Sequence, residues 1–237
     1  MKTIAIITAR GGSKRIPRKN IKEFCGKPIL AYSIEAALQS DIFDAVMVST
    51  DDKEIAEIAV RYGAEVPFFR SEQTANDYAV TSDVLQEVLT EYEKRGETFD
   101  ALCCIYPTAP FLTAPKLQKA AELLKEMAAD SVVPVVRFGF PPQRCVVMSE
   151  GYLQFKWPEY ALTRSQDLEP FYHDAGQFYF LRTASFVEQK KMFMDKTVPL
   201  EMEELEVQDI DTEQDWKIAE LKFRMMKENN ECRRKSR

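Results

Sequence analysis

Short runs rich in β-branched residues alternate with helix-like apolar patterns through the first 137 residues of the chain. Such alternation is typical of β-α-β units, in which consecutive strands run parallel and the connecting helices cover the sheet. The pattern therefore predicts an α/β fold with a mostly parallel sheet flanked by helices. The strands are expected at residues 3–8, 45–49, 101–105 and 131–137, and the helices begin near residues 28, 51, 81 and 115. Thr50 or Asp51 is the expected N-cap of the second helix, and Thr81 or Ser82 that of the third.

The pattern changes in the second half of the chain. Residues 138–173 are rich in prolines and aromatic side chains, and a Glu150-Gly151 pair separates two short apolar runs, which predicts an inserted β-hairpin. Such an insert is suited to packing against a partner subunit. We expect one domain over residues 1–228 and a charged, frayed tail over 229–237. The remaining expected elements are strands at 176–181 and ending in 207–211, and helices at 185–191 and 212–226.

Composition and charge narrow the function. The formal net charge of −6 argues against a general nucleic-acid binder, which would normally present a basic face. The apolar run at residues 4–7 is too short for a signal peptide, and the sequence has no run of about 18 uncharged apolar residues. We therefore expect a cytoplasmic protein that does not enter the membrane. Cys103, Cys104 and Cys145 lie in apolar stretches and are expected to be reduced core thiols.

A basic, glycine-containing loop, TARGGSKRIPRKN at residues 8–20, follows the first expected strand directly. Glycine permits close backbone approach to a phosphate, and a nucleoside triphosphate needs several cations at the carboxyl end of a strand. The loop matches neither the Walker A pattern nor the GxGxxG fingerprint. The alternative interpretation is a solvated basic turn. The residues concerned are Arg10, Gly11, Gly12, Ser13, Lys14, Arg15, Arg18 and Lys19.

A second candidate feature is the pair of carboxylates at Asp209 and Asp211, just before the last expected helix. On an extended segment both carboxylates point to one face, while Ile210 points to the other. Two carboxylates with waters and substrate phosphates are a typical Mg²⁺ environment. The spacing alone favours a solvated strand edge or the N-cap of the last helix over a metal site.

Four motifs, in order along nearly the whole chain, resemble those of the sialic-acid cytidylyltransferase family, the CMP-sugar-acid synthetases. The resemblance implies a Rossmann-like nucleotidyltransferase fold with Mg²⁺ as cofactor. It also implies that CTP and a nine-carbon 2-keto sugar acid are the substrates, and that the protein is a homodimer with residues 138–173 as a dimerisation insert. The motifs are ITARGGSKRIPRKN at residues 7–20, STDD at 49–52, PTAP at 107–110 and DIDT at 209–212.

The same resemblance implies roles for individual residues. The glycine-rich loop would hold the triphosphate, Asn20 would contact the base or ribose, and a later arginine and hydroxyl would read the cytidine. The anomeric hydroxyl of the sugar acid would attack the α-phosphorus and release pyrophosphate. With one histidine in the chain, the proton acceptor is a metal-bound hydroxide or Asp211. The implied catalytic residues are Arg10, Lys19 and Asp211, the nucleotide contacts are Arg10, Gly11, Gly12, Ser13, Lys14, Lys19, Asn20, Arg70 and Thr81 or Ser82, and the metal ligands are Asp209 and Asp211.

The sugar-acid pocket is where this chain departs from the common neuraminic-acid pattern. Tyr106 stands where neuraminic-acid enzymes have glutamine, and HDAGQFY at residues 173–179 resembles the pseudaminic-acid branch of the family. The segment TRSQDL at 163–168 resembles the family's substrate loop. We therefore expect pseudaminic acid as substrate. The alternatives are neuraminic or legionaminic acid and, from a different class, a non-catalytic nucleotide-binding protein. The implied substrate contacts are Tyr106, Arg164, Gln166, His173, Asp174 and Gln177, although His173 also fits a structural role and Gln177 and Tyr179 also fit core positions.

Overall fold

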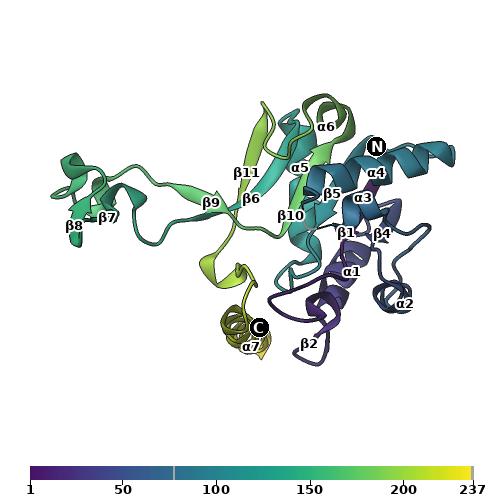
Figure 1. The fold of residues 1–237 in the computed structure, drawn as a ribbon, viewed down its shortest axis with the longest axis horizontal. Coiled ribbons are helices and arrows are strands. Elements are labelled where there is room, and N and C mark those ends of the chain that lie inside the picture. The colour runs from purple at the N-terminus through teal and green to yellow at the C-terminus, as the bar shows by residue number, and fades with distance from the viewer. Residues whose placement is uncertain (77, 236–237) are drawn as a thin grey trace.

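The computed structural model, which describes residues 1–76 and 78–235, is built on a seven-stranded sheet (Figure 1). The strand order is β11-β6-β10-β5-β1-β4, and β9 pairs with β6. Five strands share one direction, while β10 and β9 run antiparallel to their neighbours, so the predicted mostly parallel α/β sheet is confirmed. The strands are β1 (Thr3–Thr8), β4 (Ala45–Ser49), β5 (Ala101–Ile105), β6 (Ser131–Arg137), β9 (Tyr172–Asp174), β10 (Phe178–Arg182) and β11 (Thr197–Glu201).

Helices cover both faces of this sheet. Side chains alternate along each strand, so Ala5 and Ile7 of β1 pack towards one helix layer, while Ile4 and Ile6 pack towards the other. The sheet and the two helix layers on its faces form three stacked layers of secondary structure, as the β-α-β pattern predicts. The first layer holds α1 (Ile29–Ser40), α2 (Lys53–Arg61) and α5 (Ala114–Glu126); the second holds α4 (Thr81–Lys94) and α6 (Thr183–Gln189); α3 (Glu72–Ala75) precedes α4.

The C-terminal helix α7 (Glu213–Lys235) packs against the N-terminal region of the chain. Trp216 and Phe24 form an edge-to-face pair with ring centroids 5.5 Å apart, next to the small hairpin β2 (Glu23–Phe24) and β3 (Lys27–Pro28). The helix continues through most of the segment that was predicted to be a frayed tail, because its backbone is helical to Lys235. Residues 236–237 of that tail lie outside the described residues.

Residues 138–171, called the arm below, extend away from the sheet (Figure 1), whereas Tyr172 and His173 at the end of the predicted insert belong to β9. The predicted hairpin is confirmed as β7 (Val146–Ser149) and β8 (Tyr152–Phe155). Glu150 and Gly151, with φ of 52° and 83°, form a two-residue turn whose backbone twist suits a hairpin. Three short 3₁₀ helices, η2 (Pro142–Arg144), η3 (Pro158–Tyr160) and η4 (Ser165–Asp167), complete the arm.

Three predictions of local structure were wrong. Residues 207–211 are not a strand, because β11 already occupies the sheet edge beside β6, and the chain reaches α7 through η5 (Glu204–Glu206) and irregular backbone. The N-cap of α2 is Asp52, whose Oδ1 accepts from the Ile55 N–H at 3.0 Å, and not Thr50 or Asp51. Helix α4 starts at Thr81 itself, so Thr81 and Ser82 lie within its first turn and the extended residue Val80 holds the cap position.

Two of the three cysteines predicted to be core thiols lie in the core. Cys103 and Cys104 are fully buried free thiols, whereas the free thiol of Cys145 is only partly buried and is not a core group. Within the described residues, none of the helices has both the length and the apolar character that crossing a membrane requires.

Candidate active site

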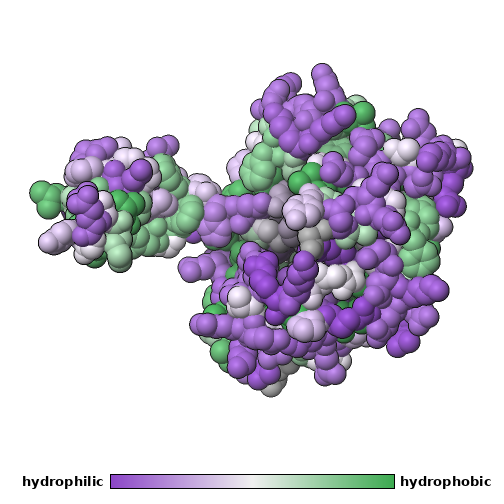
Figure 2. Space-filling view, in the orientation of Figure 1, coloured by the Kyte–Doolittle hydropathy of each residue, from purple (hydrophilic) through white to green (hydrophobic). Residues whose placement is uncertain are grey.

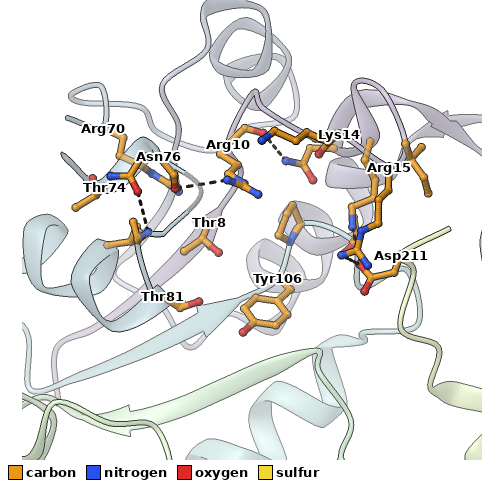
Figure 3. Close-up of a pocket in the computed structure, with 18 residues that line it drawn as sticks. Thr8, Arg10, Lys14, Arg15, Arg70, Thr74, Asn76, Thr81, Tyr106 and Asp211 are labelled. Carbon is orange, nitrogen blue, oxygen red and sulfur yellow. Dashed lines mark hydrogen bonds and ion pairs between the residues drawn. The ribbon is translucent and has the colours of Figure 1, made fainter. Parts of the chain in front are cut away.

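A cleft of about 480 Å³ opens at the carboxyl ends of β1 and β5 (Figure 3). Strand β1 pairs with β4 on one side and with β5 on the other, so the chain passes from β1 to β4 and then crosses back to the opposite side of β1 to form β5. Ligands of open α/β sheets bind at such a switch point. The cleft is lined by Thr8, Arg10, Ser13, Lys14, Arg15, Ile16, Lys19, Asn20, Arg70, Thr74, Asn76, Ala79, Thr81, Val84, Tyr106, Pro107, Thr108 and Asp211.

The basic loop after β1 forms one wall of the cleft, as predicted. Arg10, Lys14 and Arg15 lie along it in Figure 3, and Lys19 stands at the start of the 3₁₀ helix η1 (Lys19–Ile21). Asn20 is buried and donates its side-chain N–H to the Arg10 carbonyl at 2.8 Å, so it fixes the backbone of the loop as well as lining the cleft. Gly11 and Gly12 lie on the loop without appearing in the cleft lining.

The STDD motif holds this loop in place. The Gly11 N–H donates to Asp51 Oδ1 at 2.9 Å, and Asp52, besides capping α2, forms an ion pair with both guanidinium nitrogens of Arg18. The hydrogen bonds from Arg18 lower the pKa of Asp52. Arg18, whose backbone is left-handed with φ 55°, also pairs with Glu54. Its charge is therefore used to anchor the loop rather than to face the cleft.

The DIDT segment supplies Asp211 to the same wall. Asp211 Oδ1 lies 2.8 Å from Arg15 and 3.6 Å from the Lys19 ammonium, which also donates to the Ile210 carbonyl at 2.7 Å. Ile210 is buried on the opposite side, as the alternation predicted. Asp209 lies outside the cleft lining; desolvation and then the negative charge of Asp211 raise its pKa.

The helix cap at the start of α7 is made by other residues. The Thr212 N–H donates to Asp215 Oδ2 at 2.7 Å, and the Asp215 N–H donates to the Thr212 hydroxyl oxygen at 3.2 Å. This is a reciprocal capping arrangement of the helix start. Asp209 and Asp211 are therefore not consumed as caps, so the helix-cap alternative for the DIDT pair was wrong.

Two carboxylates of this segment fit a hard divalent cation that completes its shell with water and phosphate oxygens. Among the described residues no group of three or more histidine, cysteine, aspartate or glutamate side chains is arranged to hold a metal ion.

The opposite wall presents hydroxyls and a buried arginine. Thr8, Thr81 and Tyr106 lie along it in Figure 3, at the ends of β1, α4 and β5. Arg70 is buried, and its guanidinium donates to the Ser49 carbonyl at 2.7 Å; burial lowers its pKa. Of the two candidate hydroxyls Thr81 and Ser82, the one in the cleft lining is Thr81.

The predicted sugar-acid residues are brought together only in part. Tyr106 lines the cleft, and its backbone N–H donates to the Gln177 carbonyl at 2.9 Å. The Gln177 side chain is 2% exposed and donates to the Glu206 carbonyl, so in this chain it is a core residue and not a cleft residue. Asp174 accepts from the Tyr179 hydroxyl behind the cleft.

The remaining predicted contacts lie on or near the arm. Arg164 is exposed and pairs with Asp167 at 2.7 Å, and Gln166 lines a separate cavity of about 380 Å³ at the base of the arm. The His173 ring packs against Phe138 with centroids 4.9 Å apart, which is a structural contact. Within one copy of the chain, none of these three side chains belongs to the described lining of the cleft.

Sequence reasoning missed several cleft residues. Thr8 ends β1 and Thr108 follows β5, and both strands were predicted correctly. Their position at the carboxyl edge of the sheet could therefore have identified them as cleft residues. Thr74 and Asn76 come from the α3 region, and Asn76 meets the loop through its carbonyl, which accepts from Arg10 at 3.5 Å. That long-range contact has no sequence signature.

A three-layer α/β fold with a cation-lined cleft, an aspartate pair and a hydroxyl wall at the switch point defines a nucleotidyltransferase-type site. The family model described as "Cytidylyltransferase" matches residues 4–228, and the chain belongs to this family of enzymes.

Relatives and solved structures agree with this assignment. The pseudaminic acid cytidylyltransferase of Campylobacter jejuni is 40% identical over 230 residues, covering 97% of this chain and 99% of the relative. The CMP-N,N'-diacetyllegionaminic acid synthase of Legionella pneumophila is 38% identical, covering 98% and 99%. A structure of CMP:2-keto-3-deoxy-manno-octonic acid synthetase complexed with CTP has a TM-score of 0.67 at 18% identity, covering 96% of this chain and 100% of that one, and it supports the fold.

Proposed function

We propose that this enzyme transfers CMP from CTP to the anomeric hydroxyl of a nine-carbon 2-keto sugar acid, pseudaminic acid, and releases pyrophosphate. The observation that carries the proposal is the cleft itself. Arg10, Lys14, Arg15 and Lys19 line it together with Asp211, and hydroxyls face them across it. A triphosphate and a polyhydroxylated acceptor need these two kinds of wall side by side.

In the proposed reaction the loop cations bind the triphosphate and fix the α-phosphorus beside Asp211. The oxygen of the anomeric hydroxyl forms a bond to this phosphorus, and the bond to the bridging oxygen breaks, so that its electron pair leaves with pyrophosphate. Because Lys19 contacts both the loop and the Ile210 carbonyl, it sets the distance between the phosphates and Asp211. Preorganised cations of this kind stabilise charge that develops in the transition state.

Asp209 and Asp211 would hold Mg²⁺, which supplies charge neutralisation at the phosphates when it is bound. The proton of the anomeric hydroxyl needs an acceptor, and Asp211 is the acidic side chain among the described residues that line the cleft. We therefore assign Asp211 both to the metal and to the proton.

The choice of pseudaminic acid rests on two supports. Two pseudaminic acid cytidylyltransferases of Campylobacter jejuni are 40% and 39% identical to the chain over nearly its full length. Tyr106, in the cleft, is a departure from the glutamine of the neuraminic-acid pattern. Because the legionaminic acid enzyme is 38% identical to this chain, legionaminic acid is the alternative substrate.

The test is pyrophosphate release from CTP and Mg²⁺ with pseudaminic, legionaminic and N-acetylneuraminic acids. We expect kcat/KM for pseudaminic acid to exceed kcat/KM for neuraminic acid by at least roughly 100-fold, because a mismatched sugar acid leaves buried polar groups unpaired. A higher kcat/KM for legionaminic or neuraminic acid would reject the substrate and keep the reaction. A lack of turnover with all sugar acids, with CTP still bound, would favour the non-catalytic alternative.

We also propose that the protein is a homodimer in which the arm packs on a second copy. The arm exposes many large apolar side chains, and Figure 2 shows green patches on it at the left of the molecule. Exposed apolar surface of this density marks a protein interface. The exposed residues include Val146, Val147, Met148, Tyr152, Leu153, Phe155, Trp157, Tyr160 and Leu162.

Packing of the arm on a second copy would also allow Arg164 and Gln166 to contact substrate in the cleft of that copy, since they lie outside the cleft of their own chain. Light scattering should give the mass of a dimer for the wild type and of a monomer for Leu153→Asp. The exposed Val60, at 59%, lies on α2 away from the arm, and Val60→Asp is the matched control. A monomeric wild type would reject the proposal.

A further inference from the structure

A partly buried ion pair joins the first turn of α5 to η5. The Lys116 ammonium lies 3.1 Å from Glu206 Oε2, and the lysine side chain is 14% exposed. The same ammonium donates to the Phe111 carbonyl at 3.1 Å. Phe111 directly follows the PTAP motif, whose first residues line the cleft. Lys116 therefore connects a wall of the cleft to the segment that precedes Asp209.

The position of Lys116 is unfavourable for a lysine on its own. Helix α5 begins at Ala114, so Lys116 lies in the first turn, where the helix dipole disfavours a cation. Burial removes the ammonium from water and lowers its pKa. A buried ion pair adds little to stability, because the cost of desolvation offsets the attraction between the charges. The pair with Glu206 is therefore better explained by the geometry that it fixes than by the stability that it adds.

Two further side chains hold the same segment. The buried Gln177, which directly precedes β10, donates to the Glu206 carbonyl. The Lys222 ammonium of α7 donates to the Val207 carbonyl at 2.8 Å and to the Glu204 carbonyl at 3.2 Å. Val207 is itself buried in a small apolar cluster. The backbone at residues 206–207 is thus fixed from α5, from the start of β10 and from α7.

The aspartates of the DIDT segment follow this fixed point closely. Asp209 is three residues after Glu206, a separation that spans at most about 11 Å, and it lies on irregular backbone. On its other side, Lys19 holds the Ile210 carbonyl. Asp209 therefore stands between two anchors, one at Glu206 and one at Lys19.

We propose that Lys116 is a positioning residue for Asp209. By holding Glu206 against the wall of the cleft, it fixes the distance between Asp209 and Asp211, so that both carboxylates can bind one Mg²⁺ that also binds the triphosphate. The inference rests on the proposed function, because it takes the two aspartates as the metal ligands. Residues that orient a metal ligand without touching the metal typically change metal affinity by about tenfold to 100-fold when they are replaced.

Lys116→Met tests the proposal, because methionine keeps an unbranched apolar side chain and removes the charge. Calorimetry measures CTP binding with and without Mg²⁺ in the absence of sugar acid. In the wild type Mg²⁺ should tighten CTP binding, since the ion is shared between the aspartates and the phosphates. In Lys116→Met the Kd for CTP without Mg²⁺ should change less than about twofold, while the tightening by Mg²⁺ should fall roughly tenfold. A residue that merely stabilised the fold would not separate these two constants.

Glu206→Gln removes the other charge of the pair at a more exposed position, since this side chain is 29% exposed. It should weaken the Mg²⁺ effect in the same direction, and it keeps the proposal testable where Lys116→Met does not fold. Because the two changes act on one contact, the double variant should lose no more of the Mg²⁺ effect than Lys116→Met alone. Losses that multiply would contradict an action through the pair.

The matched control is Lys27→Met. Lys27 also forms a partly buried pair with a glutamate, Glu35, but this pair joins β3 to α1. Its loss should leave the Mg²⁺ effect on CTP binding at the wild-type value, whatever the change in melting temperature, which is measured for every variant.

The outcomes separate the proposal from the function on which it rests. A Mg²⁺ effect in Lys116→Met and Glu206→Gln that matches the effect in Lys27→Met would overturn this inference alone. If Mg²⁺ neither tightens CTP binding nor supports turnover in the wild type, the metal assignment fails, and this inference fails with it. A wild type that releases no pyrophosphate with any sugar acid would overturn the proposed function in its own assay.

Discussion

Gly11→Ala should destabilise the protein through one contact that the structure defines. An added Cβ at Gly11 would lie 2.9 Å from Asp52 Oδ2 and 3.1 Å from Asp52 Cβ. Asp52 cannot turn away without cost, because Arg18 holds both its oxygens and because it caps α2. Overpacking of this kind costs about 1–3 kcal/mol, and a chain of this length loses about 2–4 °C in Tm per kcal/mol. At the middle of this range, about 2 kcal/mol, we expect a fall of roughly 4–8 °C.

Thermal melting followed by circular dichroism measures this, and the neighbouring glycine is the control. A Cβ at Gly12 would meet no described atom within 4 Å, so Gly12→Ala should keep the wild-type Tm. An Asp52→Ala background removes the oxygen at 2.9 Å and keeps Cβ at 3.1 Å, so adding Gly11→Ala should then cost less than it does in the wild type. The reasoning is refuted if Gly11→Ala melts like Gly12→Ala, or if its cost is the same with and without Asp52.

Three further predictions concern charge. Lys19→Ala should raise KM for CTP about tenfold to 100-fold by removing a charge-assisted contact. The control is Lys22→Ala, which should leave this KM unchanged because the Lys22 ammonium pairs with a glutamate of α7; activity measured over a range of CTP concentrations decides. Asp211→Asn should lower kcat about 100-fold or more but spare CTP binding without metal, measured by calorimetry. Because Arg18 lowers the pKa of Asp52, that pair stabilises the fold above about pH 4 and loses its effect as pH falls through the lowered pKa, so Asp52→Asn should flatten the acid side of a Tm–pH curve; an unchanged curve contradicts this.

Most of the sheet was predictable because its signals are local. The apolar strands β1, β4, β5 and β6 have the predicted bounds, and the Glu150-Gly151 turn forms the hairpin. The direction of β10 was not predictable, because the same apolar run fits a parallel or an antiparallel neighbour.

The cap of α2 illustrates why neighbouring polar residues are hard to tell apart. Ser49, Thr50, Asp51 and Asp52 can all cap a helix by residue type. Asp52 takes the role because Arg18, 34 positions earlier, pairs with it, while Asp51 is occupied by the Gly11 N–H. The choice depends on contacts between distant segments, which no window of sequence contains.

The basic loop at residues 8–20 and the DIDT segment at 209–212 act as one unit in the fold. Ile16 of the loop and Ile210 between the two aspartates are buried in the same apolar cluster, together with Trp216 of α7. Lys19 then joins the two segments by donating to the Ile210 carbonyl. The spacing between the cations and Asp211 is therefore set by a packed core beneath the cleft and not by flexible side chains. Since a displacement of about 1 Å can cost about 100-fold in rate, this core explains why 191 residues of chain separate two parts of one site without loosening it.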